Sequence, residues 1–142
     1  MASISATKVY AAPVDKVWTT LTDLSRMPDW NTSHLAFPEA PPAVLEPSMK
    51  FTQKISNMGM PSEVRWTIVK VEAPNLLEFK GQGPMNVTVK MRYEVEAVDG
   101  GTQVTIANEF TGAMVRMAGK RLTQSGQADL EASLVKFAEV VE

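Results

Sequence analysis

Three polar side chains interrupt the apolar faces of the strands that the sequence predicts. Residues of a strand point alternately to its two faces, so Gln53, Tyr93 and Asn108 each share a face with apolar neighbours. A buried amide or phenol needs a hydrogen-bond partner, and apolar walls with a few polar groups are typical of a small-molecule pocket. We therefore expect these three residues to orient polar atoms of a ligand. The alternative is that Gln53 and Asn108 bond each other, or a buried water, inside a filled core.

Nine methionines are many for a chain of 142 residues. The thioether side chain is flexible and polarizable, so methionine suits an adaptable apolar surface as well as ordinary core packing. Together with apolar residues on the same strand faces and on the last predicted helix, some of them complete a candidate pocket. Its predicted ligand-binding residues are Phe51, Gln53, Trp66, Met91, Tyr93, Ile106, Asn108, Phe110, Met114, Met117 and Leu122.

His34 is the candidate for acid–base catalysis, because an imidazole titrates near neutral pH. A histidine at the surface, or one that caps an element, is the alternative interpretation. Charged residues on the outward strand faces, such as Glu63 and Arg65, are expected to form solvated cross-strand pairs. The sequence has one histidine and no cysteine, which excludes a multi-histidine metal site, a thiolate zinc site and a disulfide. We expect no metal and no cofactor.

The composition is that of an ordinary globular protein, with 44% apolar and 21% charged residues. The balance of 14 basic and 16 acidic residues gives a net charge of −2, which is unlike a nucleic-acid binder. No apolar run approaches the ~20 residues of a membrane span, and the first residues lack the pattern of a signal peptide. We expect a single cytoplasmic domain over 1–142, present as a monomer or a homodimer.

Two kinds of periodicity divide the chain into the elements that must position these side chains. Residues 3–10 alternate as a half-buried strand does, and apolar residues at helical spacing predict a pair of short helices over 13–32. Prolines make 38–48 a loop, and the helical period returns over 113–141. Between the loop and this long helix, alternation predicts strands over 49–55, 62–72, 76–81, 86–97 and 104–110.

An antiparallel sheet with one apolar face must be covered by another element, and only the helix over 113–141 is long enough. We therefore expect an α+β fold, a helix-grip arrangement. A curved antiparallel sheet of about six or seven strands wraps around the C-terminal helix in this arrangement, and two short helices follow the first strand. Whether side chains fill the space between sheet and helix decides what the protein can do.

The sequence Ala-Ala-Pro-Val-Asp-Lys-Val-Trp at 11–18, with Leu-Thr-Asp-Leu-Ser-Arg-Met-Pro-Asp-Trp-Asn at 21–31, resembles the START and polyketide-cyclase superfamily. This superfamily has the helix-grip fold of the birch-pollen allergens, and the resemblance covers essentially the whole chain. The chain is also similar to small single-domain actinobacterial members, some of which are catalogued as toxins of toxin–antitoxin pairs. Because the superfamily contains carriers, sensors and enzymes, the resemblance specifies the fold more than the activity.

The resemblance implies that a hydrophobic or amphipathic small molecule, such as a lipid or a polyketide-like ring system, binds between the sheet and the last helix. It also implies a cavity mouth at the strand loops and the start of that helix. The methionines there, which would form a flexible apolar gate, are Met58, Met60, Met85, Met114 and Met117. Two alternatives remain: a cyclase, aromatase or dehydratase, and an interaction module with a protein partner, such as a toxin.

Overall fold

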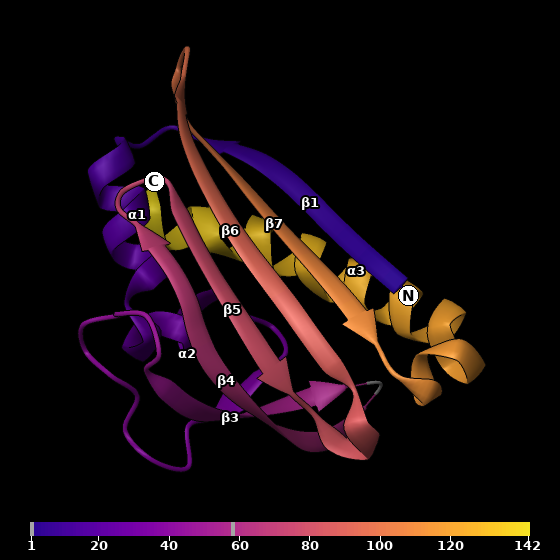
Figure 1. Ribbon diagram of the computed structural model, residues 1–142. Coiled ribbons are helices and arrows are strands. Elements are labelled where there is room, and N and C mark those ends of the chain that lie inside the picture. The colour runs from indigo at the N-terminus through magenta and orange to yellow at the C-terminus, as the bar shows by residue number, and fades with distance from the viewer. Residues whose placement is uncertain (1, 58) are drawn as a thin grey trace.

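A single curved antiparallel sheet of seven strands forms the larger layer of the molecule (Figure 1). The computed structural model describes residues 2–57 and 59–142. The strands lie in the order β1-β7-β6-β5-β4-β3-β2. Each strand from β2 to β6 therefore pairs with the next one along the chain, and β1 pairs with β7. The strands are β1 (Ala2–Tyr10), β2 (His34–Ala36), β3 (Lys50–Asn57), β4 (Met60–Glu72), β5 (Leu76–Gln82), β6 (Thr88–Val98) and β7 (Gly101–Thr111).

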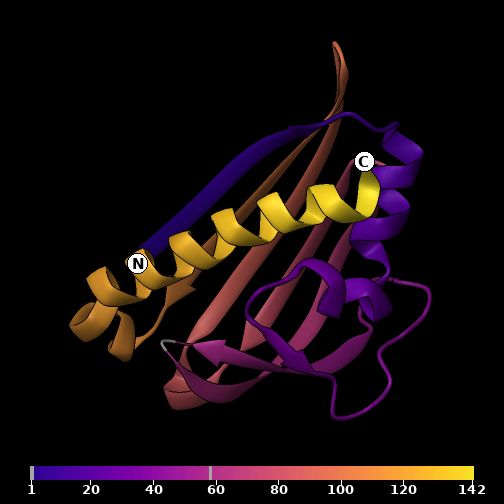
Figure 2. The same cartoon turned by 180° about the vertical axis from the view of Figure 1, so that it is seen from behind.

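The long helix α3 (Ala113–Val141) lies across the concave side of this sheet (Figure 2). Three short helical segments follow β1, namely α1 (Val14–Thr22), the 3-10 turn η1 (Leu24–Arg26) and α2 (Met27–Trp30). A further 3-10 turn, η2 (Pro84–Asn86), separates β5 from β6. The expected α+β helix-grip fold, with short helices after the first strand and a helix over 113–141, is confirmed. Within 2–57 and 59–142, no helix is both long and apolar enough to cross a membrane.

The β6–β7 hairpin shows how sequence alternation sets the inward face. The turn at Asp99–Gly100 pairs Val98 with Gly101, and Gly100 has a φ of 86°, a value that favours glycine. From that turn, the register pairs Tyr93 with Ile106. Because both strands alternate with a period of two, their buried side chains all point to the concave side.

The two ends of α3 have different surroundings, because the short helices cover only one end of the sheet. Its C-terminal half packs densely: the Tyr10 hydroxyl donates a 2.6 Å hydrogen bond to the backbone oxygen of Leu134. The Phe137 ring meets those of Tyr10 and Trp30 edge-on, each at a centroid distance of 5.2 Å. Trp30 itself lies against Tyr93 on the sheet. The aromatic core therefore sits beneath the C-terminal half of the helix.

Candidate ligand cavity between the sheet and helix α3

A cavity lies between the sheet and the part of α3 that precedes this aromatic core. Its volume, counted as the space open to the centre of a water molecule, is about 180 Å³. That is more than ten times the ~10–15 Å³ that one water needs on the same measure. The cavity is partly open to solvent, and the residues of α3 that line it run from Val115 to Ser133. The space under the helix is therefore not filled by the protein's own side chains.

Most of the predicted ligand-binding residues line this cavity. Strand alternation directs them there from β3, β4, β6 and β7, and the helical face of α3 contributes one of them. Phe51 instead borders a small adjoining space, which it shares with Gln53 and Tyr93. The predicted residues that line the main cavity are Gln53, Trp66, Met91, Tyr93, Ile106, Asn108, Phe110 and Leu122.

Met117 does not line the cavity, because its side chain is 86% exposed. Val115 and Leu122 mark the face of α3 that borders the cavity. Met117 follows Val115 by two residues, which corresponds to a rotation of about 200° around the helix axis, so Met117 points away from that face. The sequence expectation for this residue was wrong by half a turn.

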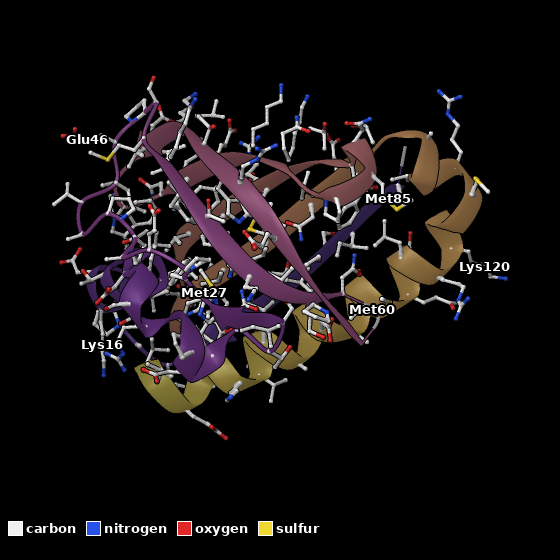
Figure 3. The ribbon with its side chains drawn as sticks, turned by 90° about the horizontal axis from the view of Figure 1, so that it is seen from below. Lys16, Met27, Glu46, Met60, Met85 and Lys120 are labelled. Atoms are coloured by element: carbon white, nitrogen blue, oxygen red, sulfur yellow. The ribbon has the colours of Figure 1, made fainter. Side chains whose placement is uncertain are left out.

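The methionine gate expected at the cavity mouth stays a prediction for Met60 and Met85. Figure 3 shows Met60 at the end of the β3–β4 hairpin and Met85 beyond the end of β5. Both side chains are largely exposed, and neither residue lines the cavity. Met58 and the side chain of Met114 lie outside what the structure describes.

Gln53 connects the cavity wall to His34 through a chain of side-chain hydrogen bonds. Its Oε1 accepts from Nε1 of Trp66 at 3.0 Å, and its Nε2 lies 2.9 Å from Nδ1 of His34. Antiparallel pairing of β3 with β4 and of β2 with β3 brings the three side chains together. Gln53 therefore finds its partners in His34 and Trp66, and the alternative in which it bonds Asn108 is not what the structure contains.

His34 contacts Gln53, a residue of the cavity wall, but does not itself line the cavity. Its backbone N–H donates to Oδ1 of Asn31, which places the imidazole at the start of β2, and its ring contacts that of Phe37. Partial burial lowers the pKa of His34 below its ordinary value. Two other titratable residues, Glu63 and Glu109, are exposed. The histidine is thus placed to position Gln53, and His34, the acid–base candidate from the sequence, does not line the cavity.

Three buried polar atoms lack a hydrogen-bond partner among the described residues, and all three belong to residues that line the cavity. They are Nε1 of Trp30, Oγ of Ser62 and Oδ1 of Asn108. Tyr93 also borders the cavity, and burial raises the pKa of its phenol above the ordinary value. Because buried polar groups are normally paired, this arrangement is typical of a site whose polar atoms bond a molecule from outside the chain.

Asp129 and Ser133 on α3 are cavity residues that the sequence analysis missed. They continue the helical spacing of Leu122 and Gly126, and this periodicity could have identified them. Oγ of Ser133 accepts from the backbone N–H of Thr32 at 3.0 Å. The Thr32 hydroxyl in turn donates to the backbone oxygen of Asp129, which ties α3 to the turn after α2.

Asp129 contributes an acidic group to this otherwise mostly apolar wall. Partial burial raises the pKa of its carboxyl above the ordinary value, because desolvation disfavours the charged form. In the described part of the chain, no three histidine, cysteine, aspartate or glutamate side chains gather in a way that could hold a metal ion. The polar side-chain groups of the cavity lining are therefore amides, hydroxyls, two indoles and this carboxyl group.

A curved antiparallel sheet that grips a long helix, with a partly open apolar cavity between the two, defines a helix-grip protein of the cavity-containing kind. The chain belongs to the polyketide cyclase/dehydrase and lipid transport family, which matches residues 1–142. The resemblance seen in the sequence is thereby confirmed. Among curated proteins, the chain is similar to "toxin Rv0910" of Mycobacterium tuberculosis, with 28% identity over 141 residues, 99% of this chain and 98% of that protein.

Solved structures with low sequence identity have the same fold. The chain superimposes on protein CV1439 of Chromobacterium violaceum with a TM-score of 0.78 and 12% identity, covering 100% of this chain and 99% of the other. DynU16, from the dynemicin biosynthetic locus, gives a TM-score of 0.72 and 17% identity over 98% of this chain and 46% of its own. At these identities the likeness concerns the fold alone.

Proposed function

We propose that the protein binds a hydrophobic or amphipathic small molecule, of lipid or polyketide-like character, in the cavity beneath α3. The observation that carries this proposal is the coincidence of an apolar cavity with three unpartnered buried polar atoms in its wall. Membership of a family described by cyclase, dehydrase and lipid transport functions supports the same class of ligand. Burial of apolar ligand surface supplies the driving force, at roughly 25 cal/mol per Å² before ordering costs.

Polar groups in the wall orient the ligand. Tyr93 and Asn108 approach from adjacent strands β6 and β7, and Ser62 approaches from β4. A ligand with oxygen or nitrogen atoms at one end can satisfy these groups while its apolar part contacts Ile106 and Leu122. The amide of Gln53 already forms hydrogen bonds to His34 and Trp66. Gln53 therefore positions Trp66 in the cavity wall and does not orient the ligand itself.

A neutral fluorescent probe that brightens in apolar surroundings, N-phenyl-1-naphthylamine, tests this function directly. Displacement of the probe by n-decanol, added below its micelle concentration, measures binding of an uncharged amphiphile. Val89→Phe and Leu122→Trp each fill part of the cavity from opposite walls, and we expect both to weaken probe binding at least about tenfold. Val69→Phe is the matched control, because Val69 is exposed on β4 and lies outside the cavity lining.

Each variant is first compared with the natural protein by circular dichroism and thermal melting, so that loss of fold is recognised. Equal probe affinity in the natural protein and in the folded cavity-filling variants would contradict the proposal. The natural protein's own ligand is sought by native mass spectrometry after purification from its host.

A proton-transfer enzyme of the cyclase, aromatase or dehydratase type is a second candidate, and Asp129 is the observation that favours it. A general acid or base needs a titratable group in a cleft, and a carboxyl of raised pKa in the cavity wall fulfils that condition. Incubation with linear poly-β-ketones would reveal such an activity as loss of water in the mass of the cyclised product. Asp129→Asn should abolish the activity, whereas His34→Gln should preserve it.

A protein partner is a third candidate, favoured by the relative that is named a toxin. The large exposed apolar side chains of the described chain include Leu35, Val69 and Met117, which belong to three different elements. Light scattering after size exclusion distinguishes a monomer from a homodimer, and co-purification with the product of a neighbouring gene would identify a partner. Binding of such a partner with an empty cavity would favour this candidate over ligand binding.

A further inference from the structure

Asp129 places a carboxylate in the wall of the cavity, one helical turn before Ser133 on α3. Of the lining residues that the structure describes, Asp129 is the one whose side chain is charged at neutral pH. Arginine, lysine and histidine do not occur in that lining. The cavity wall therefore carries negative charge without a basic side chain that could neutralise it.

The Asp129 carboxylate takes part in none of the ion pairs found among residues 2–57 and 59–142. Those pairs join Arg26 to Asp29, Lys70 to Glu72, and Arg92 to Glu78 and Glu94. The backbone of Asp129, in contrast, is held by the 3.0 Å hydrogen bond from Oγ1 of Thr32. The raised pKa of its carboxyl agrees with a partly desolvated acid that has no cation beside it.

Two further polar groups of the wall come from other elements and also lack partners in the described chain. Trp30, on α2, is 1% exposed and its Nε1 is unpaired, and Asn108, on β7, is 9% exposed and its Oδ1 is unpaired. Asn108 points to the same side of β7 as Ile106 and Phe110, both of which line the cavity. These observations are independent of Asp129, and they indicate hydrogen bonding to a molecule within the cavity.

We propose that the cavity selects an apolar molecule that carries a protonated amine, with Asp129 as the counter-ion of that amine. The inference rests on the proposed function of ligand binding and specifies its ligand class. An ammonium group has three donors, which suit the Asp129 carboxylate together with a neutral acceptor such as Oδ1 of Asn108. A fatty acid or a phosphate ester would instead place like charges together in a partly desolvated site, which is unfavourable.

The ring of Tyr93 adds a favourable surface for a cation, because the face of an aromatic ring carries partial negative charge. This contribution is smaller than that of the carboxylate, and it does not distinguish a primary from a quaternary amine. The hydrogen bonds to Asp129 and Asn108 do distinguish them, since a quaternary nitrogen has no N–H to donate.

Three probes with one alkyl chain and different head groups test the inference at about pH 7, where a simple amine is protonated and a carboxylic acid is ionised. They are n-decylamine, n-decanol and n-decanoate, each titrated below its micelle concentration against bound N-phenyl-1-naphthylamine. For the natural protein we expect the amine to bind about tenfold more tightly than the alcohol, and the carboxylate to bind most weakly. Asp129→Asn should remove the advantage of the amine over the alcohol.

Glu131→Gln is the matched control, because Glu131 is an exposed acid on the same helix whose carboxylate accepts from Nε2 of Gln127 outside the cavity. This variant should keep the order of affinities of the natural protein. Decanoate binding as tightly as decylamine to the natural protein would overturn the inference, and so would an amine preference that survives in Asp129→Asn. The comparison of head groups on the natural protein needs no variant, so it decides the question even if a variant fails to fold.

The same titrations separate this inference from the function on which it rests. Failure of all three probes, the neutral alcohol included, would contradict binding of amphiphiles in the cavity. Binding of the alcohol without any preference for the amine would leave the proposed function standing and overturn the role of Asp129 alone.

Discussion

Gln53 holds the single histidine of the chain, His34, in one neutral tautomer, with its Nε2 2.9 Å from Nδ1 of the imidazole. The indole of Trp66 can only donate, so the atom that faces it across 3.0 Å must be the amide oxygen of Gln53. The amide nitrogen therefore donates to Nδ1, which must be unprotonated. Neutral His34 consequently carries its proton on Nε2, and a second proton on Nδ1 would set two donors against each other.

The first prediction concerns the titration of His34. Its pKa is lowered in the folded protein, so the unfolded chain takes up a proton first as the pH falls. The stability contributed by neutral His34 is present above the ordinary value of 6.5 and is lost as the pH falls through the folded pKa. We expect the free energy of unfolding in urea to decrease from about pH 7.5 to about pH 5, and this dependence to shrink in His34→Gln.

Nitrogen NMR of the histidine ring and of the Trp66 indole checks the same prediction at atomic level. Nδ1 of His34 should show the shift of an unprotonated acceptor at neutral pH, and the Trp66 Nε1–H signal should move as the ring titrates. A ring protonated on Nδ1 in the neutral form would contradict the assigned hydrogen bonds.

The second prediction concerns Gln53→Leu, which removes the acceptor of the Trp66 indole and the donor to His34 together. The indole N–H would then be buried without a partner, which costs about 1–3 kcal/mol of unfolding free energy. Gln82→Leu is the control, because Gln82 is exposed and its hydrogen bond to Thr88 lies at the surface. Urea unfolding measures the loss of unfolding free energy in each variant. Equal losses in the two variants would show that the buried hydrogen bonds of Gln53 contribute nothing to stability.

The third prediction concerns the effect of the partly buried Asp129 carboxyl on the pH dependence of stability. Its raised folded pKa means that the stability linked to the protonated form is present below the ordinary value of 3.8 and is lost as the pH rises through the folded pKa. We therefore expect Asp129→Asn to raise Tm at about pH 7 and to leave it unchanged at about pH 3. A lower Tm of this variant at neutral pH would show that an unseen partner stabilises the carboxylate.

The fourth prediction compares two glycines of α3. A Cβ atom at Gly119 would meet only Val115, at 3.9 Å, so Gly119→Ala should gain most of the helix propensity of alanine, about 0.8–1 kcal/mol. At Gly126 the Cβ would lie 2.9 Å from Cδ1 of Ile4, which lines the cavity and would have to move. The gain from Gly126→Ala should therefore be smaller, and probe binding should weaken in this variant alone. Urea unfolding and probe titration measure the two effects.

The inward direction of the strand residues was predictable because it depends on local geometry alone. Alternation with a period of two puts Tyr93 on the concave face of the sheet whatever its partner strand is. The register of β6 with β7 follows from a two-residue turn at Asp99–Gly100, which the sequence also indicates. For the same reason, the face of Asn108 was predicted without knowledge of the cavity that it borders.

The partners of Gln53 were not predictable, because they come from strands that are placed by tertiary pairing. His34 follows the short helices and reaches Gln53 across the β2–β3 pair, 19 positions away in sequence. Trp66 is adjacent only because of the register between β3 and β4. A polar residue on an apolar face indicates that a partner exists, but the alternation contains no information about which residue it is.

By itself, the sequence determined the order of elements, the inward faces of the strands and the family, since periodicity and local motifs encode these features. Only the tertiary structure decided how α3 is rotated and how far it stands from the sheet. That rotation turns Met117 to solvent and Asp129 toward the cavity, although both lie on the same helix. The spacing of residues along a helix fixes only the angles between their side chains around the helix axis. The rotation of α3 relative to the sheet is set by packing of residues such as Phe137 against Tyr10 and Trp30.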